Sequence, residues 1–204
     1  MLKRTTGRLL LGLLVITGLA GTLKNSSLSQ KERKQAIGLI RSSKNEVLRS
    51  VHGLSRAQIN YKASSKDLSI AELIINMASL EKKCSDDIKA IMSQPSDAEN
   101  RLKITLTDDQ LLVSNTSALW KTPIPANTKI SLKDPAEALK KFITLRDHHI
   151  KYIRTSTEDL RNHVVSTPAG WIDCYQYFLL LADQSNYFIE KINRVKSLPG
   201  FPKK

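Results

Sequence analysis

The sequence contains few aromatic residues and only two cysteines. Aromatic residues make up 5% of the 204 residues, so no cluster of rings offers a surface on which bases of a single nucleic-acid strand would stack. Cys84 and Cys174 stand alone, with no C-x-x-C pair and no histidine at ligand spacing, which gives no support to a cysteine zinc site. Both fall at core-like helical positions and are interpreted as packed thiols.

Acidic residues are also scarce. The chain has 19 Asp and Glu against 32 Lys and Arg, which gives a formal net charge of +13. Clustered cations would attract nucleic acid or an anionic membrane. Here they are dispersed, as in Lys66, Lys82, Lys83, Lys89, Lys103 and Lys133. We therefore expect a solvated basic surface and no nucleic-acid partner.

Near its start the sequence has a single apolar run, over residues 9–20. Lys3, Arg4 and Arg8 precede this run, and the small residues Gly18 and Ala20 end it. The layout predicts a signal peptide over residues 1–21, because a membrane span needs about 20 apolar residues. An uncleaved signal anchor is the alternative, and it would provide the chain's one membrane contact. Either way we expect an exported, periplasmic or envelope-associated protein.

The rest of the chain, residues 31–204, predicts one all-α domain, since 41% hydrophobic content in 204 residues suffices for one core. Helical periodicity predicts a first helix over residues 31–51, ended by Gly53, and a second that begins at a Ser69 and Glu72 capping box. Asn76 lies near the edge of the apolar face of this second helix, where a satisfied polar residue is the simplest interpretation.

A long connection follows, over residues 94–133, with a short helix capped by Thr107. A connection of this length can carry the chain back to the other end of a bundle and make the flanking helices parallel. Asp134 and Pro135 then begin a third helix. On it, His149 points either inward or, as we favour, to a hydrogen-bonded or partly exposed position. Residues 171–196 predict the last helix, and no convincing strand is found.

Three stretches resemble the DinB-like family of four-helix-bundle proteins, particularly its exported bacterial branch. GLSRAQINYKASSKDLSIAELIINMA is similar to the family's W-S-I-x-E-x-x-x-H segment, with Leu68 in place of the tryptophan. YIRTSTEDLRNHVVSTPAGWIDCYQYFLLLADQSNYFIEKI is similar to its D-L-R-x-H loop followed by a helix with an H-x-x-x-H pair. RVKSLPGFPKK is similar to its terminus. The resemblance implies a four-helix bundle with a long crossover between the second and third helices.

The same resemblance implies a divalent metal such as Zn or Ni, held by three histidines from the second and last helices. Here those positions are Asn76, Gln184 and Phe188. Amides are poor transition-metal ligands beside imidazole, and a phenyl ring cannot ligate. We therefore expect no metal cofactor, although a relocated site at His149 is an alternative. The resemblance also brings Cys84 and Cys174 to one level of the bundle, where a disulfide stays open.

We therefore expect a non-catalytic envelope protein that binds a small ligand or has a structural role. The candidate ligand pocket consists of Asn76, Met77, His149, Gln184 and Phe188. The alternative is a divergent hydrolase or thiol S-transferase that uses a displaced metal site. A third interpretation is a bundle that forms homodimers through its outer helix faces.

Overall fold

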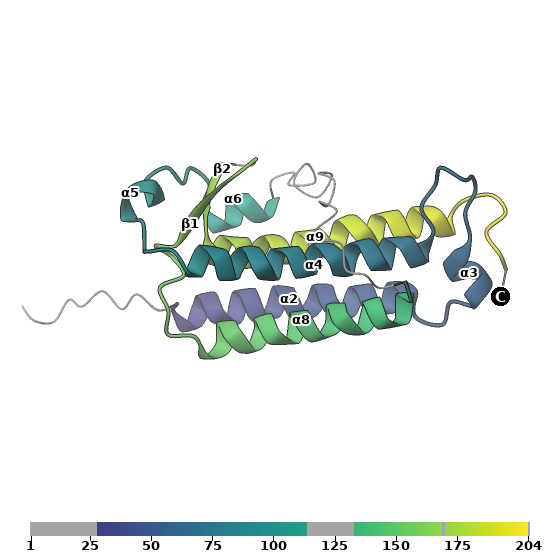
Figure 1. Cartoon of the computed structure of the whole chain (residues 1–204), viewed down its shortest axis with the longest axis horizontal. Coiled ribbons are helices and arrows are strands. Elements are labelled where there is room, and N and C mark those ends of the chain that lie inside the picture. The colour runs from purple at the N-terminus through teal and green to yellow at the C-terminus, as the bar shows by residue number, and fades with distance from the viewer. Residues whose placement is uncertain (1–27, 114–132, 169, 204) are drawn as a thin grey trace, which may run out of the picture.

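The computed structural model describes residues 28–113, 133–168 and 170–203, and four long helices make up most of this part of the chain. The long helices are α2 (Gln30–Val51), α4 (Ile70–Met92), α8 (Pro135–Thr155) and α9 (Cys174–Lys196) (Figure 1). The expected four-helix bundle is thus confirmed. The expected signal peptide or anchor over residues 1–21 lies outside the described residues.

The starts of the long helices are fixed by local hydrogen bonds, as the sequence predicts. The Ser69 hydroxyl accepts from the backbone N–H of Glu72 at 3.2 Å, and the Glu72 carboxylate accepts from the Ser69 N–H at 2.8 Å. At α8, Asp134 is the cap and Pro135 is the first helical residue. Both predicted helix starts are confirmed, because each satisfies backbone donors that have no partner within the helix.

The directions of the long helices follow from the long connection between α4 and α8. α2 packs against α8 and α9, and α4 packs against the same two helices. α2 and α9 run parallel, since Tyr175 donates to the Glu32 carbonyl near their starts at 3.2 Å, while Lys196 donates to the Ser50 carbonyl near their ends. α4 and α8 also run in the same direction (Figure 1). The expected crossover topology is therefore confirmed.

A β-hairpin precedes the last helix and corrects the expectation that the chain has no strand. β1 (Val164–Thr167) and β2 (Gly170–Asp173) pair antiparallel, with Thr167 opposite Gly170. Gly170 has a φ of 105°, which only glycine adopts readily. The last helix therefore begins at Cys174 and not at residue 171. Trp171 and Ile172 are apolar because they belong to a strand that packs on the bundle.

Within the described residues, three short helices flank the bundle: α3 (Arg56–Asn60), α5 (Ala98–Arg101) and α6 (Asp108–Val113). α3 and α5 lie at opposite ends, and α6 lies alongside the first half of α9 (Figure 1). α6 begins where the sequence predicts, because the Thr107 hydroxyl accepts from the backbone N–H of Gln110 at 3.2 Å, and it packs against α9. At the opposite end of the bundle, the Gln58 side chain of α3 donates to the Pro202 carbonyl at 2.9 Å and ties down the C-terminal segment.

Candidate functional site

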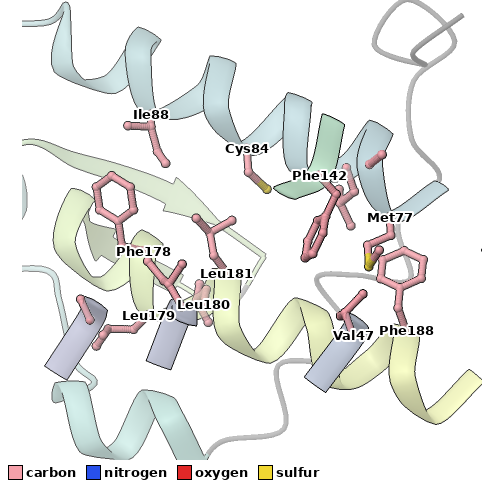
Figure 2. Packing of buried hydrophobic residues seen from close by; sticks show 14 of the residues in the cluster. Val47, Met77, Cys84, Ile88, Phe142, Phe178, Leu179, Leu180, Leu181 and Phe188 are labelled. Atoms are coloured by element: carbon pink, nitrogen blue, oxygen red, sulfur yellow. The ribbon is translucent and has the colours of Figure 1, made fainter. Parts of the chain in front are cut away.

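The residues at the three positions where the resemblance implies histidines do not share one environment. Gln184 is fully buried and Phe188 is 4% exposed, whereas Asn76 is only half-buried. Met77 belongs to the same hydrophobic core as Phe188, and its side chain points toward the Phe188 ring (Figure 2). Phe188 therefore fills the bundle interior with apolar surface at this level.

An arginine lies fully buried near the centre of the bundle. Arg146 of α8 is 0% exposed, and its Nε donates to Oε2 of the equally buried Glu81 at 2.9 Å. Its Nη1 donates to the Ser43 hydroxyl at 3.2 Å, and its Nη2 donates to the Ser185 hydroxyl at 3.1 Å. A buried charge requires such partners, because leaving an ion unpaired in the interior costs several kcal/mol.

Gln184 belongs to this buried network. Its Oε1 accepts from Nη2 of Arg146 at 3.2 Å, and its Nε2 lies 3.7 Å from the Cys84 sulfur as a donor. The side-chain oxygen that could ligate a metal is therefore already bonded to a permanent cation. A divalent ion at this oxygen would lie beside the guanidinium and be repelled. Together with the phenyl ring of Phe188, this donor set does not suit a divalent metal.

His149 is buried rather than partly exposed, so the favoured sequence expectation was wrong and its alternative was right. The imidazole is 2% exposed, and its Nδ1 lies 3.1 Å from Oε1 of Glu81. This distance suits an ion pair, but no hydrogen bond forms between the two groups, and Glu81 Oε1 and both ring nitrogens lack a hydrogen-bond partner within the described residues. Helical geometry explains the correction: Arg146 and His149 are three residues apart and therefore share the inner face of α8.

A pocket of about 360 Å³ opens beside His149, between α4, α8 and α9. Its inner wall is apolar, with Ile88 and Met92 from α4 and Phe178 from α9. The Phe178 ring meets the His149 ring edge to face, with the two centroids 5.6 Å apart. The volume lies at the lower end of the range for small-molecule sites, roughly 300–1,000 Å³.

The rim of this pocket is polar. Lys89, His148 and Glu158 line it together with Tyr152, whose hydroxyl donates to the Glu158 carboxylate at 2.5 Å. Burial and this hydrogen bond raise the pKa of Tyr152, so the phenol stays protonated as a donor. Burial, then the neighbouring His149 and Lys89, lower the pKa of His148. The rim thus has neutral and charged groups around an apolar interior.

Of the five residues predicted to line a ligand pocket, His149 is the one that lines this one. The others are Asn76, Met77, Gln184 and Phe188, and none of them borders the pocket beside His149. Sequence reasoning missed the remaining lining residues. The pattern did contain a signal, since Ser85, Ile88 and Met92 follow one another at helical spacing on the face of α4 that meets His149.

The D-L-R segment forms a second, structural cluster at the hairpin end of the bundle. Arg161 donates to Glu32 at 2.7 Å, to Asp108 at 2.6 Å and to Asp173 at 2.9 Å, and its guanidinium lies 4.1 Å from the centroid of the Tyr175 ring. These carboxylates come from the starts of α2, α6 and α9, so a single cation joins three elements. Burial raises the pKa of Asp173 even though Arg161 opposes that shift.

Both cysteines are free, buried thiols. Burial and the nearby Glu81 raise the pKa of Cys84 to about 12. Burial also raises the pKa of Cys174, as does Asp173 beside it. The interpretation as packed thiols is confirmed, and the disulfide that the resemblance left open is absent from the structure.

The described residues contain neither a clustered metal site nor a membrane-spanning helix. Among residues 28–113, 133–168 and 170–203, no group of three or more His, Cys, Asp or Glu side chains is arranged to hold a metal ion. Of the helices in the described part of the chain, none is long and apolar enough to cross a membrane.

The fold is similar to a solved structure. No protein-family model matches this sequence, and comparison with curated proteins gives no match either. YfiT from Bacillus subtilis, described as a probable metal-dependent hydrolase with an unusual four-helix bundle topology, aligns with a TM-score of 0.55 over 83% of this chain and 89% of its own. The two sequences are 14% identical, so the likeness shows a shared fold alone.

Proposed function

We propose that this chain is an exported DinB-like protein that works without the three-histidine metal site and binds a small molecule in the pocket beside His149. The fold part of the proposal rests on the likeness to YfiT. The absence of a metal rests on Gln184, whose oxygen is bonded to Arg146, and on Phe188, which cannot ligate.

One observation supports ligand binding most directly. His149 is almost fully buried and lines an open pocket, and neither of its ring nitrogens has a hydrogen-bond partner among the residues that the structure describes. A buried polar atom without a partner costs roughly 1–3 kcal/mol. Both ring nitrogens are fully buried, so a ligand in the pocket would recover this free energy by turning the imidazole toward itself.

The methionines provide a probe that separates the two candidate pockets. Met92 lines the pocket beside His149, whereas Met77 packs near Phe188, at the pocket predicted from the sequence. Methyl-¹³C-methionine NMR spectra would be recorded while a panel of small molecules is added: aromatic and aliphatic alcohols, which are neutral, together with amines and carboxylates. We expect the Met92 methyl signal to shift with saturation and the Met77 signal to stay in place.

Two variants make this test specific. Ser85→Leu places a larger side chain in the pocket and should abolish the Met92 response. Ser42→Leu, at an exposed position on α2, is the matched control and should preserve it. Saturable shifts confined to Met77 would place binding at the other pocket, and spectra without saturable shifts would refute ligand binding by this protein.

The second candidate is a divergent hydrolase or thiol S-transferase with a displaced metal site. The likeness to YfiT favours it, and Glu81 and His149 would supply its first two ligands because they lie 3.1 Å apart. A third protein ligand is missing from their surroundings in the described ranges. Three protein ligands are usual at catalytic zinc sites, so this candidate ranks second.

Homodimer formation through the outer helix faces also stays a proposal. Within the described residues, the large hydrophobic side chains that are exposed are Leu68 and Leu102. Neither lies on a long helix, so the outer faces of α2 and α8 present no large apolar side chain of this kind.

A further inference from the structure

Basic residues are unevenly shared between the two sides of the bundle. α2 and α8 together contain eleven Lys and Arg against four Asp and Glu, whereas α4 and α9 contain six of each. The two pairs of helices lie on opposite sides of the bundle (Figure 1). Packing therefore gathers on one side cations that the sequence spaces apart. We infer that the side formed by α2 and α8 docks on a membrane surface rich in anionic phospholipid.

An ion pair marks the solvent side of the seam between α2 and α8. Nζ of Lys44 on α2 lies 2.5 Å from Oδ1 of Asp147 on α8. Residues at helical spacing from this pair lie on the same stripe of each helix and flank the same seam. The exposed cations among them are Lys34, Arg41, Lys140, Lys151 and Arg154. These five side chains and Lys44 are called the basic face.

The acidic side chains of α2 and α8 leave most of this charge uncompensated. Asp147 is paired with Lys44, and Glu32 is paired with Arg161 of the D-L-R segment. The remaining two are the half-buried Glu46 and Glu137 in the first turn of α8. The basic face thus extends along about 30 Å of helix, at 1.5 Å per residue. Each of its cations would be attracted by anionic headgroups within about one Debye length, roughly 10 Å.

A lipid surface fits this face better than a nucleic acid does. Residues 1–21, the expected signal peptide or anchor, come shortly before α2 and would bring the chain to a membrane. Two helices side by side are too wide for the major groove of DNA, which admits one helix. α2 also contains no aromatic residue on which bases could stack.

Docking through this face is electrostatic. Within the described residues, the exposed large hydrophobic side chains are Leu68 and Leu102, and neither belongs to α2 or α8. The two helices therefore offer no large apolar side chain for insertion among the lipid tails, and binding should depend strongly on salt.

The test measures partition of the full-length protein onto phosphatidylcholine vesicles with or without about one-third phosphatidylglycerol, at about 0.1 M salt. Neutral vesicles report any binding through the apolar run of residues 9–20. We expect preference for the anionic vesicles, and loss of that preference near 1 M salt, where the Debye length is about 3 Å. Equal binding to both vesicle types at low salt would overturn the inference.

Two variants of equal charge make the test specific. Each replaces four cations by glutamine, two on each of two helices. The face variant carries Lys34→Gln, Arg41→Gln, Lys140→Gln and Lys151→Gln, and the control carries Lys82→Gln, Lys83→Gln, Lys191→Gln and Arg194→Gln on α4 and α9. Each cation near an anionic surface changes affinity roughly fivefold. We therefore expect a loss of more than about a hundredfold in the face variant and less than about tenfold in the control. Equal losses would show attraction by net charge alone and refute a docking face.

A fluorescent label gives the orientation on the membrane. Cys84 and Cys174 are buried, so a thiol reagent would label an added surface cysteine selectively. Asn45→Cys lies one residue from Lys44 on α2, and Ala90→Cys is exposed on α4. A quencher on the lipid headgroups should quench the label at position 45 strongly and the label at position 90 weakly, and equal quenching would contradict the docked orientation. Tighter binding to a DNA duplex than to anionic vesicles, lost in the face variant, would assign this face to nucleic acid and overturn the membrane partner.

Discussion

At the scale of single residues, Arg146 organises the hydrogen bonds at the buried centre of the bundle. It is buried at 0% exposure and contacts residues of α2, α4 and α9 through Ser43, Glu81 and Ser185. Helical spacing on α8 allows position 145 or 146 to face the core, and leucine fits an apolar core better than arginine does. Both are buried. Arg146 can be buried because Glu81, at helical spacing from Met77 and Ile88 on the inner face of α4, provides a buried counter-charge.

Replacing Arg146 alone should strongly destabilise the protein. Arg146→Met leaves the Glu81 carboxylate buried without its strongest partner, which should lower the free energy of unfolding by about 3–5 kcal/mol. The double variant Arg146→Met/Glu81→Leu removes both charges and should recover most of that loss. Urea unfolding monitored by circular dichroism measures both effects. A double variant as unstable as the single one would show that the pair is needed for reasons other than its charges.

The two thiols should be unreactive in the native protein. Burial of Cys84 and Cys174 raises both pKa values, that of Cys84 to about 12, so very little thiolate forms at neutral pH. A colorimetric thiol reagent should therefore label neither cysteine in buffer and both in denaturant. Fast labelling of either cysteine in native conditions would contradict the packing described for them.

At the scale of elements, the sequence predicts helix starts well and the hairpin poorly. Ser69 and Asp134 are recognisable caps because their hydrogen bonds are local. The strands β1 and β2 are only four residues long, and the apolar Trp171 and Ile172 merge with the pattern of α9. The β-branched pair Val164 and Val165, followed by Pro168 and Gly170 in the sequence, was the available signal. The pocket beside His149 was harder still to predict, because its residues come from three helices whose relative rotation depends on the whole core.

Arg161 should be the residue on which the hairpin end of the bundle depends most. Arg161→Met removes the cation shared by Glu32, Asp108 and Asp173, and should lower the free energy of unfolding by roughly 2–3 kcal/mol, less than for a fully buried pair because Arg161 is partly exposed. Arg154→Met, in the exposed last turn of α8, is the matched control and should change it little. Equal stabilities of the two variants in urea would refute the structural role of the cluster.

At the scale of the whole molecule, the fold is similar to that of a known protein, whereas the side chains at the resemblance's metal positions are different. The bundle and its crossover are similar to the fold of YfiT, a probable metal-dependent hydrolase. The interior differs from a three-histidine centre at each position that the sequence resemblance identifies, and Arg146 occupies the space beside Gln184. A shared fold does not by itself establish a shared reaction. The central claim is that this bundle works without a metal.

The most direct test of that claim is elemental analysis of the purified protein, without a histidine tag, after incubation with Zn²⁺, Ni²⁺ or Mn²⁺ and removal of unbound ions. The positive control restores the three histidines and removes the buried charge pair, through Asn76→His, Gln184→His, Phe188→His, Arg146→Met and Glu81→Leu. We predict that this variant binds stoichiometric metal and that the natural protein stays empty. Stoichiometric metal in the natural protein that is lost in His149→Ala would contradict the account and establish a displaced metal site at Glu81 and His149.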